Sequence, residues 1–353
     1  MLALMALRRI VIVSLMLLAA TGCSTVQYYG QAVSGHLEIM GASRPLEQVI
    51  EDPSTEERVR ERLRLAAEAR RFASRELSLP DNRSYTRYAD LGRGAVVWAL
   101  YAAPEFDTAP HRWCYPLVGC LAYRGYFDQA EAMREAKKLA SLGMDTHVAP
   151  VPAYSTLGWF ADPLLNTMMA WDDEVVAALI FHELAHQVVY VPGDTEFNEA
   201  FAVAVEREGM RRWLAASGRS DRLEAWLARK SSAARFTRSL LALRAELTRL
   251  YARPLSAQSM RAAKAAAMER ARSDFRQRLR ERPGERAFTH WYGAGLNNAR
   301  LNVLAVYERW VPAFEQLLER EDRDLERFYR EVRRLGGLQP DERARRLRAL
   351  DTP

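Results

Sequence analysis

The stretch FHELAHQVVY, residues 181–190, places two histidines and a glutamate in an otherwise apolar segment. No Pro or Gly interrupts the chain from Asp172 or Asp173, either of which can cap a helix, through Tyr190. Apolar residues surround the predicted helix on nearly all sides, so we expect it to be buried. Burying ionisable side chains costs much free energy unless something pairs with them. The fold must therefore supply partners for the charged groups of this helix.

The spacing within this segment matches a metal site. His182 and His186 are four residues apart, so their rings project from one face of a helix about one turn from each other. In that arrangement two imidazole nitrogens can reach one Zn²⁺ ion at roughly 2.0–2.1 Å. Glu183 lies about 100° around the helix axis from His182, where it can reach a metal-bound water as general base. The alternative is two hydrogen-bonded core histidines without a metal.

The next segment offers a third ligand, which a catalytic zinc site usually requires. The Pro-Gly pair at 192–193 is expected to end the first helix, and Asp194 or Thr195 to cap a second. A helix-turn-helix reversal of this length can bring Glu199 back to the first helix. The predicted zinc ligands are therefore His182, His186 and Glu199.

HELAH followed by Asn198-Glu199 resembles the gluzincins, thermolysin and the zinc aminopeptidases among them, whose third zinc ligand is the Glu of an Asn-Glu pair. FNEAFA is similar to the corresponding run of the aminopeptidases. The gap of 13 residues from His186 to Glu199 is shorter than in either group, and Val203 stands where thermolysin-like enzymes have an Asp. Glu206, on the same helical face, either orients a ligand histidine or is a solvated carboxylate.

Two patterns divide the chain after its first 22 residues. Residues 23–170 alternate short apolar runs with helical patterns, which predicts an N-terminal α/β region with a small mixed sheet. STLGWFAD, residues 155–162, is expected to be its substrate-binding edge strand, with Asp162 either meeting a substrate amine or serving as a turn residue. Residues 171–353 contain the zinc helix and are helical in pattern. The expected fold is α+β and mostly helical, a zincin-like metallopeptidase with both regions in one catalytic unit.

Peptide hydrolysis needs a group that stabilises the oxyanion in addition to the metal. His290 and Tyr292, near a Gly-rich bend, and Tyr154, on the expected edge strand, are candidates. Ordinary packing explains each of them as well, so none is assigned this role.

Residues 1–22 have the order of an export signal: a basic start, the apolar stretch IVIVSLMLLAA, and small residues. The apolar stretch is too short to span a bilayer comfortably. LLAATGC resembles the lipobox of bacterial lipoproteins, which implies cleavage before Cys23, lipidation of that cysteine and anchoring in the lipid bilayer. Ser24 directly after it favours the outer membrane, with the protein facing the periplasm.

Cys114 and Cys120 are the two remaining cysteines, in CYPLVGC. Export would place them in an oxidising compartment, where a disulfide across this short loop is expected. The alternatives are two reduced thiols or a pair of metal ligands, for which only His111 is close in sequence.

Charge is unevenly distributed along the chain. Residues 207–353 hold 33 Lys and Arg against 19 Asp and Glu, a net of +14, and residues 1–206 hold 18 against 26, a net of −8. The arginines alternate with Leu and Ala at helical spacing, as on solvated helix faces, and no aromatic-basic motif accompanies them. We therefore expect no nucleic-acid partner.

The lipobox, YYGQAVSGHLEI, GYFD, STLGWFADPL, FHELAHQ, NEAFA and GLNNARL together resemble one bacterial family over nearly the whole mature length. That family is the predicted aminopeptidases, zinc-dependent gluzincin-like lipoproteins. The resemblance implies a membrane-anchored zinc metallopeptidase of the cell envelope that hydrolyses peptide bonds through a zinc-bound water, with Glu183 as general base. Two alternatives stay open: a non-catalytic lipoprotein that binds a peptide or protein, and a zinc amidase acting on cell-wall fragments.

Overall fold

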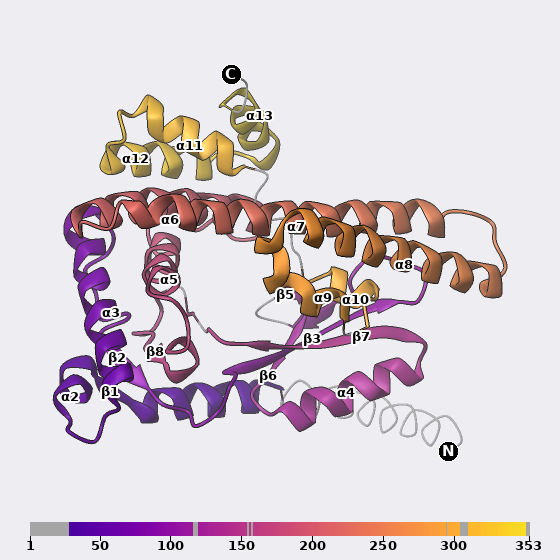
Figure 1. Ribbon diagram of the computed structural model, residues 1–353, viewed down its shortest axis with the longest axis horizontal. Helices are drawn as coiled ribbons and strands as arrows, with labels where there is room; N and C mark the ends of the chain where they lie inside the picture. Colours follow the sequence, from indigo (N-terminus) through magenta and orange to yellow (C-terminus); the bar gives the residue numbers. More distant parts are fainter. Residues whose placement is uncertain are drawn as a thin grey trace, which may run out of the picture.

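The computed structural model describes residues 28–115, 119–153, 155–156, 158–293, 295–303 and 310–350. The expected signal segment, Cys23 and Tyr154 lie outside the described residues. Within them the chain is α+β and mostly helical, as predicted (Figure 1). Residues 28–42 are helical. The strands are β1 (Ser43–Pro45), β2 (Arg87–Ala89), β3 (Val97–Pro104), β4 (Trp113–Tyr115), β5 (Gly119–Leu121), β6 (Arg124–Tyr126), β7 (Met144–Val151) and β8 (Leu164–Leu165).

Helices form the rest of the regular structure. The short 3₁₀ helices are η1 (Asn166–Met168) and η2 (Pro283–Phe288). The α-helices are α2 (Leu46–Glu51), α3 (Glu57–Glu76), α4 (Gln129–Ser141), α5 (Asp173–His186), α6 (Thr195–Ala216), α7 (Asp221–Tyr251), α8 (Ala257–Glu281), α9 (Thr289–Gly293), α10 (Asn298–Leu301), α11 (Val311–Arg320), α12 (Leu325–Gly336) and α13 (Pro340–Leu350).

The longest strands belong to an antiparallel sheet with the order β6-β3-β7. β3 and β7 pair over their full lengths, from Val97 opposite Val151 to Pro104 opposite Met144. Helix α4 contacts one face of this sheet and α10 lies on the other (Figure 1). A second sheet has the order β1-β2-β8, and β4 and β5 form a separate antiparallel pair.

Helices α5 and α6 lie at the centre of the main core. α5 is apolar on almost every side, and Ile180, Phe181 and Leu184 are completely inaccessible to solvent. α6 and α3 pack against α5, and the C-terminal helices α11 to α13 cover the outer side of α6 (Figure 1). Because each fully buried Leu, Ile or Phe stabilises the fold by roughly 1.5–3 kcal/mol, this packing holds α5 in place despite its buried histidines.

The long helices α7 and α8 form a hairpin with its own apolar cluster, which includes Phe236, Leu240, Phe275 and Tyr292. η2, α9 and α10 pack beside this hairpin, next to the sheet that contains β3 and β7 (Figure 1). Tyr292, a candidate from the sequence, is therefore part of a hydrophobic core.

Residues 155–162 do not form the expected edge strand. The described part of this stretch is irregular and turns at Gly158, where φ is +83°. Asp162 is completely buried, and its carboxylate accepts hydrogen bonds from the backbone N–H and the hydroxyl of Thr156, both at 2.8 Å. Such local side-chain bonds compete with a sheet ladder. Asp162 is therefore a buried turn residue, and the short strand β8 directly follows it.

Helix α5 ends at His186 rather than continuing to Tyr190. The side chain of Asn198 explains the early end, because it pairs with both the N–H and the C=O of Val191 at 2.8 Å. These two bonds hold residues 187–194 in a non-helical path that leads into α6. The predicted reversal is thus present, with a longer connection than expected.

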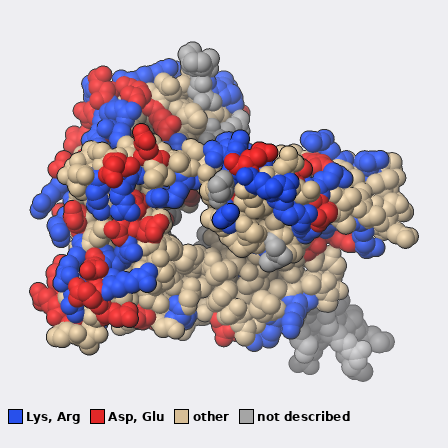
Figure 2. All heavy atoms as spheres, viewed as in Figure 1, with Lys and Arg blue, Asp and Glu red and all other residues tan. Residues whose placement is uncertain are grey.

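The surface carries mixed charge. Figure 2 shows Lys and Arg side chains interspersed with Asp and Glu over the visible face, and a hollow near the centre of the molecule, beside α5. Among the described residues, no helix combines the length and the apolar character needed to cross a membrane.

Candidate metal centre

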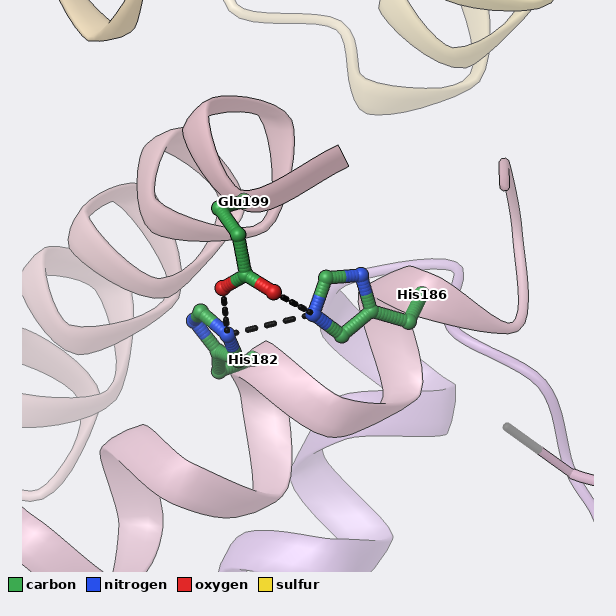
Figure 3. Close-up of side chains that lie close together, drawn as sticks. All are labelled: His182, His186 and Glu199. Atoms are coloured by element: carbon green, nitrogen blue, oxygen red, sulfur yellow. Dashed lines mark hydrogen bonds and ion pairs between the residues drawn. The ribbon is translucent and has the colours of Figure 1, made fainter. Parts of the chain in front are cut away.

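The three predicted ligands lie together, although two come from α5 and one from α6 (Figure 3). The Nε2 atom of His182 is 3.2 Å from Nε2 of His186 and 3.3 Å from a carboxylate oxygen of Glu199. The other carboxylate oxygen of Glu199 is 3.7 Å from Nε2 of His186. Each residue therefore directs a donor atom toward the same point.

These spacings fit a zinc ion. Tetrahedral ligands at 2.0–2.1 Å from one Zn²⁺ lie about 3.3–3.4 Å from one another. The 3.2 Å between the two histidine nitrogens and the 3.3 Å from His182 to one oxygen of Glu199 agree with that value, and the other oxygen of Glu199 is 3.7 Å from His186. Two imidazoles and one carboxylate are also a ligand set that zinc accepts in catalytic sites, with a fourth position open for water or substrate.

The start of α6 positions Glu199. The carboxylate of Asp194 caps this helix by accepting a hydrogen bond from the backbone N–H of Phe197 at 3.1 Å. The buried guanidinium of Arg343, from α13, holds the same carboxylate at 2.8 Å. Together with the bonds from Asn198 to Val191, this contact fixes the turn that returns Glu199 to α5. The Asn of the Asn-Glu pair therefore has a structural role.

Behind His182 lies a second carboxylate, Glu206. One of its oxygens is 3.2 Å from Nδ1 of His182, and the other is in direct contact with Nζ of Lys230 on α7. Glu206 is only 4% exposed, whereas the neighbouring Arg207 pairs with Glu315 instead. Of the two interpretations that the sequence left open, the structure therefore supports the one in which Glu206 orients a histidine.

The cluster is arranged to hold positive charge. Burial lowers the pKa of His182, but hydrogen bonds to Glu199 and Glu206 and the charge of Glu206 outweigh burial and raise it to about 10. Burial, together with the charge on His182, lowers the pKa of His186 to about 4. At neutral pH one ring therefore carries a proton between two carboxylates. A metal ion bound there would displace that proton, because only a neutral imidazole binds a metal.

Glu183 lies next to the cluster in a largely enclosed environment. Burial raises the pKa of its carboxyl, and the charge of His182 and a hydrogen bond from Ser155 partly offset this effect. Tyr85 is also close, because the charge of Glu183 contributes to the raised pKa of its buried hydroxyl after burial itself. Tyr85 has φ of +61°, an uncommon conformation for a bulky residue and one that tends to occur at functional sites. No sequence pattern indicated that Tyr85 or Ser155 lies beside Glu183.

Neither of the two described candidates for oxyanion stabilisation, His290 and Tyr292, contacts the three ligands. His290 is exposed, and its Nδ1 faces the carbonyl of Ala287 at 2.9 Å. Tyr292 stacks on Phe275 in the core of the α7–α8 hairpin. Tyr154 lies outside the described residues.

Two tyrosines that the sequence analysis did not select lie near the cluster. The ring of Tyr190 is oriented edge-on to that of His186, with 6.4 Å between centroids. Burial raises the pKa of the Tyr123 hydroxyl, and the neighbouring Tyr28, Tyr190 and Glu199 add to this effect. Tyr123 lies between β5 and β6, far from α5 in the sequence, so no local pattern could have indicated it.

Cys114 and Cys120 are opposite each other in the β4–β5 pair, and a disulfide joins them. The ring of His111 packs edge-on against Trp113. This arrangement agrees with the predicted disulfide, whose formation in the cell stays a prediction.

The fold and the site define a class: a mostly helical α+β protein with a largely buried cluster of two histidines and one carboxylate that is able to hold a metal ion. The chain matches the family model described as "Putative aminopeptidase" over residues 27–347 and therefore belongs to that family. The family description indicates a peptidase, and it confirms the aminopeptidase family predicted from the sequence, whereas the zinc dependence and the lipid anchor stay predictions. No curated protein and no solved structure matches the chain.

Proposed function

We propose that this protein is a zinc metallopeptidase of the gluzincin type with a zincin-like site, and that it acts as an aminopeptidase. One observation carries the proposal: the donor atoms of His182, His186 and Glu199 converge at zinc-ligand spacing with Glu183 beside them. The family description supports peptides as substrates. The sequence alone supports an envelope location, with a lipid anchor at Cys23 in the outer membrane and the site facing the periplasm.

The residues divide the chemistry between them. His182, His186 and Glu199 would hold the zinc ion, which when bound supplies Lewis acidity and lowers the pKa of the attacking water. Glu183 accepts the proton of that water and passes it to the leaving amine. A carboxyl whose pKa burial has raised is a stronger base than an exposed one, which suits this role. Glu206 and Lys230 fix the orientation of the His182 ring.

Peptide hydrolysis by the purified mature chain, with Cys23 replaced, tests the proposal. Wild type should release the first residue of peptides with a free amino terminus, and Glu183→Gln should be slower by about 10²–10⁴-fold, because amide nitrogen and oxygen cannot take the proton. Glu183→Gln should still bind zinc, since Glu183 is not a ligand. If only amino-blocked peptides are cleaved, the protein is a metallopeptidase but not an aminopeptidase.

The two alternatives give different results in the same assay. A zinc amidase would cleave cell-wall fragments and leave the peptides intact. A binding lipoprotein would cleave neither, and Glu183→Gln would behave as wild type in cells.

A further inference from the structure

An apolar cavity of about 300 Å³ adjoins the metal cluster, and His182 and Glu183 form part of its wall. We propose that this cavity receives the side chain of a substrate residue next to the scissile bond and selects large apolar side chains. The inference rests on the proposed peptidase function, whose substrate class it specifies. The other lining residues come from α5, α6, α7 and the turn before α5: Trp171, Val175, Ala178, Leu179, Glu206, Trp226 and Lys230.

The position of the cavity ties it to the reaction. His182 is one of the proposed ligands and Glu183 is the proposed base, so a group in the cavity lies beside the reacting atoms. Val175 is 39% exposed, which means that the cavity is open to solvent on its side. A volume of about 300 Å³ is at the lower end of the range for ligand pockets, which suits one side chain rather than a whole peptide.

The wall chemistry determines which side chain fits. Two tryptophans and three aliphatic residues offer apolar surface. Of the charged side chains in the wall, Glu206 and Lys230 neutralise each other by direct contact, and Glu183 is the proposed base beside the metal ligands. Lys230 also lies over the ring of Trp226, 5.4 Å from its centre. A charged substrate side chain would lose its hydration in this cavity without gaining an ionic partner, whereas Leu or Phe would gain apolar burial.

The cavity is formed before substrate arrives. Trp226 is 2% exposed and Ala178 is 4% exposed, so packing fixes both against the core. The small side chain of Ala178 leaves room where a larger residue would fill the cavity. Selection by this wall therefore needs no rearrangement of α5 or α7.

The test uses two peptide series, X-Ala-Ala-Ala and Ala-X-Ala-Ala, with X as Gly, Ala, Leu, Phe, Asp or Lys. Cleavage after the first residue places X on either side of the scissile bond. In one series, Phe and Leu peptides should exceed the Gly peptide by at least about 100-fold in kcat/KM, because each methylene group is worth about 10–200-fold in a tight apolar pocket. In the same series, the kcat/KM values of the Asp and Lys peptides should be equal to or lower than that of the Gly peptide.

Val175→Trp fills the cavity from its exposed rim and should lower the Phe-to-Gly ratio at least tenfold. Val33→Trp is the matched control, because Val33 is also an exposed helical valine, at 58%, and does not line the cavity. It should leave the ratio unchanged. Circular dichroism and thermal melting confirm that both variants fold.

A binding measurement separates failure of this inference from failure of the proposed function. Calorimetric titration of zinc-loaded Glu183→Gln with the same peptides reports selectivity without turnover. If wild type cleaves all X peptides equally in both series, the peptidase stands and the cavity proposal falls. If nothing is cleaved but Phe peptides bind at least tenfold more tightly than Gly peptides and Val175→Trp removes the difference, the cavity proposal stands and the peptidase falls. If nothing is cleaved and the Phe and Gly peptides bind equally tightly, both the peptidase proposal and the cavity proposal are wrong.

Discussion

Replacing Glu206 by Gln tests how the protein tunes its metal centre. In the proposed zinc site, Glu206 would stabilise the zinc-bound form of His182 through its contact with Nδ1 at 3.2 Å. The same contact also stabilises the protonated ring, which competes with zinc and has a pKa of about 10. Glu206→Gln therefore has two opposite effects on zinc affinity. It weakens zinc binding by removing the partner of the zinc-bound ring, and it strengthens zinc binding by lowering the pKa of the competing protonated ring. The pH determines which effect is larger.

The contact distance sets the size of the expected effect on zinc binding. Two full charges 3.2 Å apart would interact by about 5 kcal/mol at an effective dielectric constant of 20. A metal-bound imidazole carries only part of a charge, and Gln retains a neutral hydrogen bond, so the loss should be smaller. Removing such a partner typically weakens metal binding by about 10–100-fold, or about 1.4–2.7 kcal/mol.

Proton competition then sets the trend with pH. At pH 9.5, close to the pKa of about 10, part of the metal-free wild type carries a proton on His182, which lowers its zinc affinity. The variant should therefore bind zinc more weakly than wild type at this pH, by less than the full factor of about 10–100. At lower pH the wild type loses about tenfold per unit, whereas the variant, with a lower pKa at His182, loses less. The ratio of the two zinc affinities should therefore shift steadily in favour of the variant as the pH falls toward 6.5.

Competition with a chelator at buffered free zinc measures the zinc affinities of wild type and Glu206→Gln from pH 6.5 to 9.5. Glu208→Gln is a matched control on the same helix, because Glu208 is 3% exposed but pairs with Arg211, Arg212 and Arg323. It should lower thermal stability and leave zinc affinity unchanged. Equal affinities for wild type and Glu206→Gln at pH 9.5, with the same slope against pH, would refute the role assigned to Glu206.

Three further outcomes are expected. Cys23→Ala should abolish labelling by a fatty-acid analogue and release the protein from the membrane fraction; continued labelling would exclude the lipobox. Cys114 and Cys120 should react with an alkylating reagent only after reduction of envelope protein, and labelling without reduction would exclude the disulfide. Asp194→Ala should lower the free energy of unfolding by about 1–3 kcal/mol, since α6 loses its cap and Arg343 its carboxylate partner, whereas Asp194→Asn should recover the cap contribution. Equal urea midpoints for the two Asp194 variants would contradict the capping argument.

The local part of the site could be predicted from the sequence. Four-residue spacing places His182 and His186 on one helical face, and the Asp194 cap with the Asn-Glu pair locates Glu199 on the next helix. These features depend on helix geometry and on contacts between residues close in sequence. The α+β class could be predicted for the same reason, because helical and strand patterns also depend on residues close in sequence.

The parts that the sequence could not supply depend on long-range packing. Lys230 reaches Glu206 from α7, and Tyr85 and Ser155 reach Glu183 from loops that precede α5 in the sequence. The expected edge strand over 155–162 was wrong, because Asp162 binds Thr156 locally and closes a loop. Apolar content alone did not distinguish that loop from a strand.

Zinc content after exposure to buffered zinc is the most direct test of the central claim. Elemental analysis should find one zinc per chain in wild type and in Glu183→Gln, because both keep the three ligands. Glu199→Ala should fall well below one, since only two neutral imidazoles remain. A wild-type chain that binds no zinc, or a Glu199→Ala chain that retains a full equivalent, would contradict the assignment of His182, His186 and Glu199 as a metal centre.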